Sequence, residues 1–122
     1  MENKKKILIV DDTKSYLLVV SQKLEEEGFS VVTAENGQEG LDAVEKEKPD
    51  LILLDIEMPI MNGIEVSKKL KESGSDTPIV FLTNMGDLKH ISEAMETSTD
   101  YIVKSDSSVE SIVDMVKKRL GM

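Results

Sequence analysis

The chain contains no cysteine, so disulfide bonds, thiolate catalysis and cysteine-ligated zinc are excluded, while the redox compartment stays open. Long apolar segments are also missing, because residues 1–6 are polar and the apolar run after them is far too short to span a bilayer. We therefore expect a soluble, cytoplasmic protein with no membrane association. Basic residues are the minority, with 15 Lys and Arg against 24 Asp and Glu and a formal charge of −9. That balance disfavours direct binding to DNA or RNA.

What is present suits one compact domain spanning residues 1–122, since 39% of the 122 residues are hydrophobic. Apolar runs of strand length alternate with segments of helical period, which predicts five βα units forming a parallel sheet with helices on both faces. The expected strands are 6–10, 30–34, 51–54, 79–82 and 100–103. The expected helices are 14–27, 37–47, one beginning after Asn62-Gly63, 87–97, and a last helix after Ser107.

Helix ends carry their own signals. Gly28 follows the first helical segment and can take the left-handed cap conformation. Ser107 and Glu110 have the spacing of a capping box, which predicts the start of the last helix. That helix ends the chain, so we expect no output domain.

Two unbroken apolar runs end in carboxylates: Asp11 and Asp12 follow residues 7–10, and Asp55 follows residues 51–54. The carboxyl ends of adjacent parallel strands meet at one sheet edge, where open α/β sheets bind ligands. Each pair of acids about 5 Å apart repels by roughly 3 kcal/mol at an effective dielectric near 20. Mg²⁺, which prefers oxygen ligands, would reverse that field. A single Asp there is commonly only a turn former or N-cap, so the predicted magnesium site depends on the set, with Glu57 two residues beyond Asp55.

Two further groups follow apolar runs at the same edge. Thr83 comes directly after residues 79–82 and supplies a hydroxyl, and Lys104 comes after Tyr101-Ile102-Val103 and supplies an ammonium. A carboxylate can form an aspartyl phosphate when a metal and a cation neutralise the phosphoryl oxygens. Alone, a Thr or Lys at a strand end is usually a solvated loop residue. Their matching positions predict a phosphoryl site with Asp55 as nucleophile.

Over essentially its whole length the chain resembles the receiver domain of two-component response regulators. The features that carry the resemblance are Ile7 to Asp12, Asp55-x-x-Met58-Pro59-x-x-Asn62-Gly63, Thr83, and Tyr101 followed by Lys104. The resemblance implies a flavodoxin-like fold and a stand-alone, phosphorylation-dependent switch. It also implies that Asp55 accepts phosphate from a histidine kinase, a histidine phosphotransfer protein or a small phosphodonor.

The resemblance further assigns roles at the site. It implies that Asp11 and Asp12 hold Mg²⁺, that Asp12 and Asp55 contact it directly, and that the backbone carbonyl of Glu57 is another ligand. Thr83 and Lys104 would bind the phosphoryl group. Thr83 and Tyr101 would form a switch that reshapes the face made by the fourth helix, fifth strand and fifth helix, and so changes the affinity for an unknown downstream protein.

The chain departs from the family pattern in three places. Ser105 stands where proline usually follows the lysine, so we expect either a trans peptide bond or a strained one there. Thr97-Ser98-Thr99 replaces the usual glycine and small residue, which puts the end of the fourth helix in question. Asn84 stands where a small residue is usual.

The resemblance implies that Glu57 and Met85, two residues after Asp55 and Thr83, flank the path of the attacking water. Met85 is apolar and Glu57 negative, so neither obviously orients a nucleophilic water well. We therefore expect slow self-dephosphorylation. The alternative interpretation is that both side chains simply point to solvent. His90, the single histidine, is interpreted as a surface residue and not as a phosphoacceptor.

Three alternatives stay open from the sequence. A metal-dependent phosphatase or phosphotransferase would use the same aspartyl intermediate with Glu57 as general acid, but it would need a cap that 122 residues do not accommodate. A flavin-binding protein is disfavoured because Asp11 and Asp12 would repel a phosphate. An unphosphorylated scaffold is disfavoured by the complete set of acids, Thr83 and Lys104. The switch is expected to be monomeric or weakly dimeric and not an enzyme acting on external substrates.

Overall fold

A five-stranded parallel sheet forms the centre of the molecule, with strand order β2-β1-β3-β4-β5. The computed structural model describes residues 4–84, 100–105 and 108–122. The strands are β1 (Lys6–Val10), β2 (Ser30–Ala34), β3 (Leu51–Asp55), β4 (Ile79–Thr83) and β5 (Asp100–Val103). The predicted parallel sheet is confirmed. β3 and β4 each extend one residue further than predicted, so Asp55 and Thr83 are the last residues of their strands.

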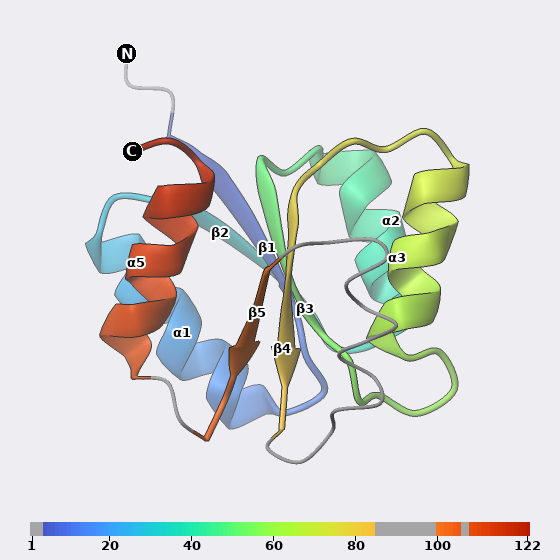
Figure 1. Cartoon of the computed structure of the whole chain (residues 1–122), viewed down its shortest axis with the longest axis horizontal. Helices are drawn as coiled ribbons and strands as arrows, with labels where there is room; N and C mark the ends of the chain where they lie inside the picture. Colours follow the sequence, from blue (N-terminus) through green and yellow to red (C-terminus); the bar gives the residue numbers. More distant parts are fainter. Residues whose placement is uncertain (1–3, 85–99, 106–107) are drawn as a thin grey trace.

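Helices cover both faces of the sheet, as predicted. The described helices are α1 (Lys14–Glu26), α2 (Gly37–Glu47), α3 (Gly63–Glu72) and α5 (Val109–Arg119). Figure 1 shows α1 and α5 on one face, and α2 and α3 on the other. The helix predicted over 87–97 lies outside the described residues.

The central strands are continuous apolar runs because both of their faces are buried. In β3, Leu51 and Leu53 belong to the core cluster under α1 and α5, while Ile52 and Leu54 belong to the cluster under α2 and α3. This alternation follows from the two-residue period of a strand. The same period determines on which face of the sheet the residues at the end of each strand lie. It therefore determines where the side chains of the site are placed.

Helix α3 begins where the sequence predicts and carries a capping box. The Asn62 side chain accepts a hydrogen bond from the Glu65 backbone N–H, and the Glu65 side chain accepts one from the Asn62 backbone N–H. At Gly63 the helix passes so close to β3 that a Cβ atom would overlap the carbonyl oxygen of Asp55 and lie 2.9 Å from its carbonyl carbon. Glycine is therefore required where α3 meets the end of β3.

The capping box predicted for the last helix from Ser107 and Glu110 is wrong by one residue. The N-cap of α5 is Ser108, whose hydroxyl accepts a hydrogen bond of 3.1 Å from the Ser111 backbone N–H. Glu110 instead lies in the first turn, where a negative charge suits the helix dipole. At the first helix, the predicted left-handed glycine is confirmed, since Gly28 has a φ of +98°.

The connection from β3 to α3 contains a strained residue. Ile60 has a φ of 71° and is fully exposed. This left-handed region is rarely adopted by β-branched residues, because the Cβ atom then crowds the backbone. The strain lies between Asp55 and the start of α3, in the loop beside the acidic cluster.

Ion pairs join the C-terminal end of α5 to distant parts of the chain. Lys117 lies 2.9 Å from Glu27 after α1, and Arg119 Nε lies 2.8 Å from Asp100 Oδ2 at the start of β5. Val116, on the same turn, is completely buried. Within the described part of the chain, no helix is both long and apolar enough to cross a membrane.

Candidate functional site

Three carboxylates meet at the carboxyl edge of the sheet, as the sequence predicts. Asp11 follows β1 and Asp55 ends β3, and these neighbouring strands are in register at Val10 and Leu54. Carboxylate oxygens of Asp11, Asp12 and Asp55 lie within 4.8 Å of one another. Asp11 and Asp55 are buried, whereas Asp12 is exposed. The cluster is therefore buried at Asp11 and Asp55 and open to solvent at Asp12.

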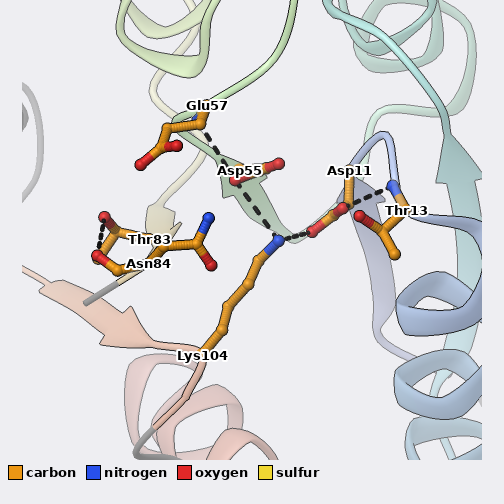
Figure 2. A network of polar contacts seen from close by, with 7 residues as sticks. All are labelled: Asp11, Thr13, Asp55, Glu57, Thr83, Asn84 and Lys104. Atoms are coloured by element: carbon orange, nitrogen blue, oxygen red, sulfur yellow. Dashed lines mark hydrogen bonds and ion pairs between the residues drawn. The ribbon is translucent and has the colours of Figure 1, made fainter. Parts of the chain in front are cut away.

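Lys104 brings a cation into this cluster. Its backbone N–H donates a 2.8 Å hydrogen bond to the Thr83 carbonyl, which fixes the residue beside the end of β4. Its Nζ lies 2.5 Å from Asp11 Oδ2 and 3.5 Å from Asp55 Oδ1 (Figure 2). With the side chain only 13% exposed, the ammonium is held between two buried carboxylates.

Backbone donors orient the two buried acids. The Thr13 N–H donates to Asp11 Oδ1 over 2.9 Å, and the Glu57 N–H donates to Asp55 Oδ1 over 3.3 Å (Figure 2). Both donors lie two residues after their acceptors, in the geometry of an Asx turn. Asp11 and Asp55 thus do form turns, as a single Asp at a strand end commonly does. Turn formation alone would not require the acids to lie close together, as they do here.

The pKa of Asp55 is raised to about 7, first because the carboxyl is buried and next because Asp11 is negative. Lys104 acts in the opposite direction but does not cancel these effects. A divalent cation would favour the ionised form of all three acids. The donor set consists of oxygens, and its open side leaves space for water, so the residues present fit the octahedral preference of Mg²⁺.

Thr83 and Tyr101 lie on the opposite face of the sheet from the Asp55 side chain. Asp55 pairs with Leu82, so the alternation of β4 turns Thr83 the other way. The Thr83 side chain is buried, and its hydroxyl donates to the Asn84 carbonyl over 3.2 Å. Tyr101 pairs with Phe81, two residues before Thr83, and is 39% exposed. The two residues share a face and a strand pair, with the ring toward solvent.

The departures from the family pattern are only partly covered by the described residues. No cis peptide bond occurs in the described ranges, so the Lys104-Ser105 bond is trans. Asn84 is exposed at the end of β4. Met85, His90 and Thr97-Ser98-Thr99 lie outside the described residues. The Glu57 side chain is exposed and points away from the Asp55 carboxylate (Figure 2).

Sequence reasoning missed Tyr16, in the first turn of α1. Lys104 Nζ lies 4.6 Å from the centroid of its ring. The two residues are far apart in sequence, and a tyrosine among apolar helix residues is an ordinary core pattern. Asp12 lies outside α1, so helical spacing does not connect the two residues, and the sequence carries no signal for this contact.

Comparison with known proteins gives a consistent family. The model of the response regulator receiver domain matches residues 7–117. Sporulation initiation phosphotransferase F of Bacillus subtilis (strain 168) is 36% identical over 117 residues, which cover 96% of this chain and 94% of that protein. The probable transcriptional regulator ycf27 of Guillardia theta is 37% identical, over 98% of this chain but 48% of that protein. The chain therefore spans about half the length of that relative.

Solved structures give the same answer. Chemotaxis protein CheY4 of Vibrio cholerae superposes with a TM-score of 0.87 at 30% identity, over 95% of this chain and 98% of that one. A CheY-like receiver domain protein of Methanospirillum hungatei JF-1 gives a TM-score of 0.90 at 30% identity, over 98% and 95%. The match of family model, sequence relatives and fold shows that the chain belongs to the response regulator receiver domain family of two-component systems.

Proposed function

We propose that this chain is a signalling switch in a two-component phosphorelay, phosphorylated on Asp55 with the help of Mg²⁺. The observation that carries the proposal is the cluster of Asp11, Asp12 and Asp55, with oxygens within 4.8 Å and the Lys104 ammonium between two of them. Such crowding of acids destabilises a metal-free fold and gives no return in packing. It is useful where a metal and a phosphoryl group are bound.

Asp12 and Asp55 would hold the ion directly, with Asp11 and the backbone carbonyl of Glu57 completing the protein's share of the ligands. A bound Mg²⁺ supplies positive charge that offsets the negative phosphoryl oxygens. The exposed position of Asp12 allows the ion to enter from solvent.

In the transfer step, a carboxylate oxygen of Asp55 forms a bond to phosphorus while the bond from phosphorus to the donor breaks. The donor is a phosphohistidine of a histidine kinase or histidine phosphotransfer protein, and its imidazole nitrogen keeps the electron pair of the broken bond. A small acyl phosphate can replace that donor. The Lys104 ammonium then binds a phosphoryl oxygen as a donor. The Thr83 hydroxyl, which donates to the Asn84 carbonyl before transfer, leaves that acceptor and donates to a second phosphoryl oxygen.

The output is a change in affinity for a downstream protein. The face concerned includes β5, α5 and the predicted fourth helix, and Thr83 and Tyr101 report the phosphoryl group to it. Support comes from their common face of the sheet and from the solvent-exposed Tyr101 ring. We take residues 1–122 as one receiver unit, monomeric or weakly dimeric, that acts in the cytoplasm without binding nucleic acid.

The rival function is turnover of an external phosphate ester through the same aspartyl intermediate. It would use Glu57 as general acid, yet that side chain is exposed and directed away from Asp55. We therefore propose that the chain catalyses only its own phosphorylation and dephosphorylation. With a chromogenic phosphate ester, at most one turnover per protein molecule is expected, and sustained turnover would support the rival.

The direct test is incubation with acetyl phosphate and Mg²⁺ followed by intact-protein mass spectrometry. Wild type is expected to gain one phosphoryl group, and Asp55→Asn none. Asp42→Asn is a matched control, because Asp42 is an exposed carboxylate on α2 that contacts Gln38. If wild type stays unmodified, or if Asp55→Asn is modified as fast as wild type, the proposed role of Asp55 is wrong.

The lifetime of the phosphorylated state is a separate prediction. Glu57 is negative and directed away from Asp55, and the other position that the resemblance places beside the attacking water carries apolar Met85, so self-dephosphorylation is expected to be slow. Decay of the phosphorylated mass after removal of acetyl phosphate, with Mg²⁺ present, measures it. Rapid loss would contradict this prediction without affecting the assignment of Asp55.

A further inference from the structure

The Lys104 ammonium has a third neighbour besides its two carboxylates. Its Nζ lies 4.6 Å from the centroid of the Tyr16 ring, within the range of a cation–π interaction. Asp11 and Asp55 occupy other sides of the same ammonium, at 2.5 Å and 3.5 Å. The ammonium thus has two carboxylates and an aromatic ring as its neighbours.

The fold brings these groups together for a simple reason. Leu53 and Ile102 belong to the core cluster under α1 and α5, so Asp55 and Lys104, two residues further along, lie on the same side of the sheet. Tyr16 lies on the first turn of α1 and packs against that cluster. The ring is therefore on the helix that covers the lysine.

Packing alone does not explain a tyrosine at this place. Its hydroxyl is buried and has no hydrogen-bond partner in the described part of the chain. A buried hydroxyl without a partner destabilises a fold, so the hydroxyl does not account for this residue, and the ring is the part of the side chain to explain. Burial, then Asp11 and Asp55, raises the pKa of Tyr16 to about 12, so the ring stays uncharged. What an aliphatic residue cannot provide is the electron-rich face that the ammonium contacts.

We propose that Tyr16 is a positioning residue for phosphoryl transfer, whose ring face holds the Lys104 ammonium at the acidic cluster. This inference rests on the proposed function, in which Lys104 binds a phosphoryl oxygen. A lysine side chain has four flexible carbon–carbon bonds, and each alternative rotamer removes the charge from the reaction. The ring reduces the number of rotamers open to Lys104 and leaves the ammonium charged. With the two carboxylates alone, the ammonium would be drawn toward Asp11, the closer of the two.

The test compares Tyr16→Leu, which removes the ring, with Tyr16→Phe, which keeps it and removes the unpartnered hydroxyl. At saturating Mg²⁺, Tyr16→Leu is expected to be phosphorylated by acetyl phosphate about five- to thirtyfold more slowly than wild type, the range of a desolvated cation–π contact. Tyr16→Phe is expected to restore the wild-type rate. Leu18→Ala, an exposed position on α1, is the control and should leave the rate unchanged.

A wild-type rate in Tyr16→Leu would overturn the proposal. An equal loss in Tyr16→Phe would overturn it too, because the hydroxyl and not the ring would then be required. If wild type itself is not phosphorylated, the proposed function fails, which is a different outcome from either of these.

A spectroscopic measurement decides the contact even if Tyr16→Leu folds poorly. In metal-free wild type, the ring current of Tyr16 should move the Lys104 side-chain methylene resonances upfield of those of the exposed lysines. The upfield shift should persist in Tyr16→Phe. Lys104 resonances that coincide with those of exposed lysines in wild type would show that no ring is in contact, and would overturn the proposal.

Discussion

At the scale of single residues, Asp55 shows how a buried carboxyl group opposes stability. Its pKa is about 7 in the folded chain, against 3.8 for the ordinary carboxyl. Because the folded state binds the proton more tightly than the unfolded state, protonation favours folding. In metal-free protein, the contribution of Asp55 to the free energy of unfolding therefore falls as the pH rises from about 4 to about 7.

Replacing Asp55 by asparagine removes the destabilisation that the ionised, buried carboxylate causes. In the presence of a chelator at pH 8, Asp55→Asn is expected to raise the free energy of unfolding by about 2 kcal/mol, because a neutral amide is less penalised by burial and is not repelled by Asp11. The gain should shrink toward pH 4. Urea denaturation at several pH values measures both effects, with Asp42→Asn as control. An unchanged pH dependence in Asp55→Asn would contradict the raised pKa.

Ile60 is a second residue whose conformation costs stability. Its φ of 71° is unfavourable for a β-branched residue, and its side chain is fully exposed, so little packing is lost on removal. Ile60→Gly is expected to raise the free energy of unfolding by about 1 kcal/mol. Ile60→Val, which keeps the branched Cβ, should show no such gain in the same denaturation experiment. A stability of Ile60→Gly equal to that of Ile60→Val would show that the backbone at this position is not strained.

At the scale of elements, the junction of β3 and α3 places Asp55. The Gly63 N–H donates to the Ile56 carbonyl over 2.9 Å, and the lack of a Cβ lets the helix approach the end of the strand. The capping box of Asn62 and Glu65 fixes where α3 begins. Asp55, the proposed phosphoacceptor, is thus held by a strand on one side and by a helix start on the other.

Gly63→Ala should disturb this junction, because its methyl group would overlap the Asp55 carbonyl. We expect a loss of about 2–4 kcal/mol in the free energy of unfolding, together with NMR shifts at Asp55 and Ile56. Gly40→Ala is the graded control, since its Cβ would meet only the side chain of Val10 at 3.0 Å. Equal costs in the two variants would mean that the junction adapts more easily than its geometry indicates.

Element positions were predictable from the sequence to the extent that they depend on local patterns. The buried strands β1, β3 and β4 read as apolar runs, and Asn62-Gly63 marked the start of α3. The start of α5 was misplaced because Ser107 and Ser108 both suit an N-cap. The packing of Ile112, Val113 and Val116 selects between them, and it depends on parts of the chain far away in sequence.

At the scale of the whole molecule, the acidic cluster was predictable because parallel strands align their ends. Asp11, Asp55 and Lys104 each follow an apolar run, and the parallel sheet brings the ends of these runs to one edge. Two features were not predictable. The preference of Lys104 for Asp11 and the contact with Tyr16 depend on side-chain positions that no sequence period encodes.

Metal binding should stabilise the entire domain. At Mg²⁺ concentrations about 100 times the Kd, the free energy of unfolding is expected to rise by about 2.7 kcal/mol, since the ion binds the folded cluster and not the unfolded chain. Thermal melts across a Mg²⁺ titration measure this effect. Asp12→Asn, which alters the exposed carboxylate of the cluster, should reduce it. A melting temperature that does not respond to Mg²⁺ would count against the metal site.

The position of Lys104 makes this chain's own lysine a competitor of the metal. In the metal-free fold the ammonium lies closer to Asp11 than to Asp55. If Asp11 served as a ligand of a divalent cation, the ammonium would be released from Asp11, and an ammonium attracted by a phosphoryl oxygen would leave Asp11 free for the cation. Each ligand therefore removes an obstacle to the other, and linkage requires that the two affinities rise by the same factor. We therefore expect that, at the proposed site, metal and phosphoryl group bind cooperatively.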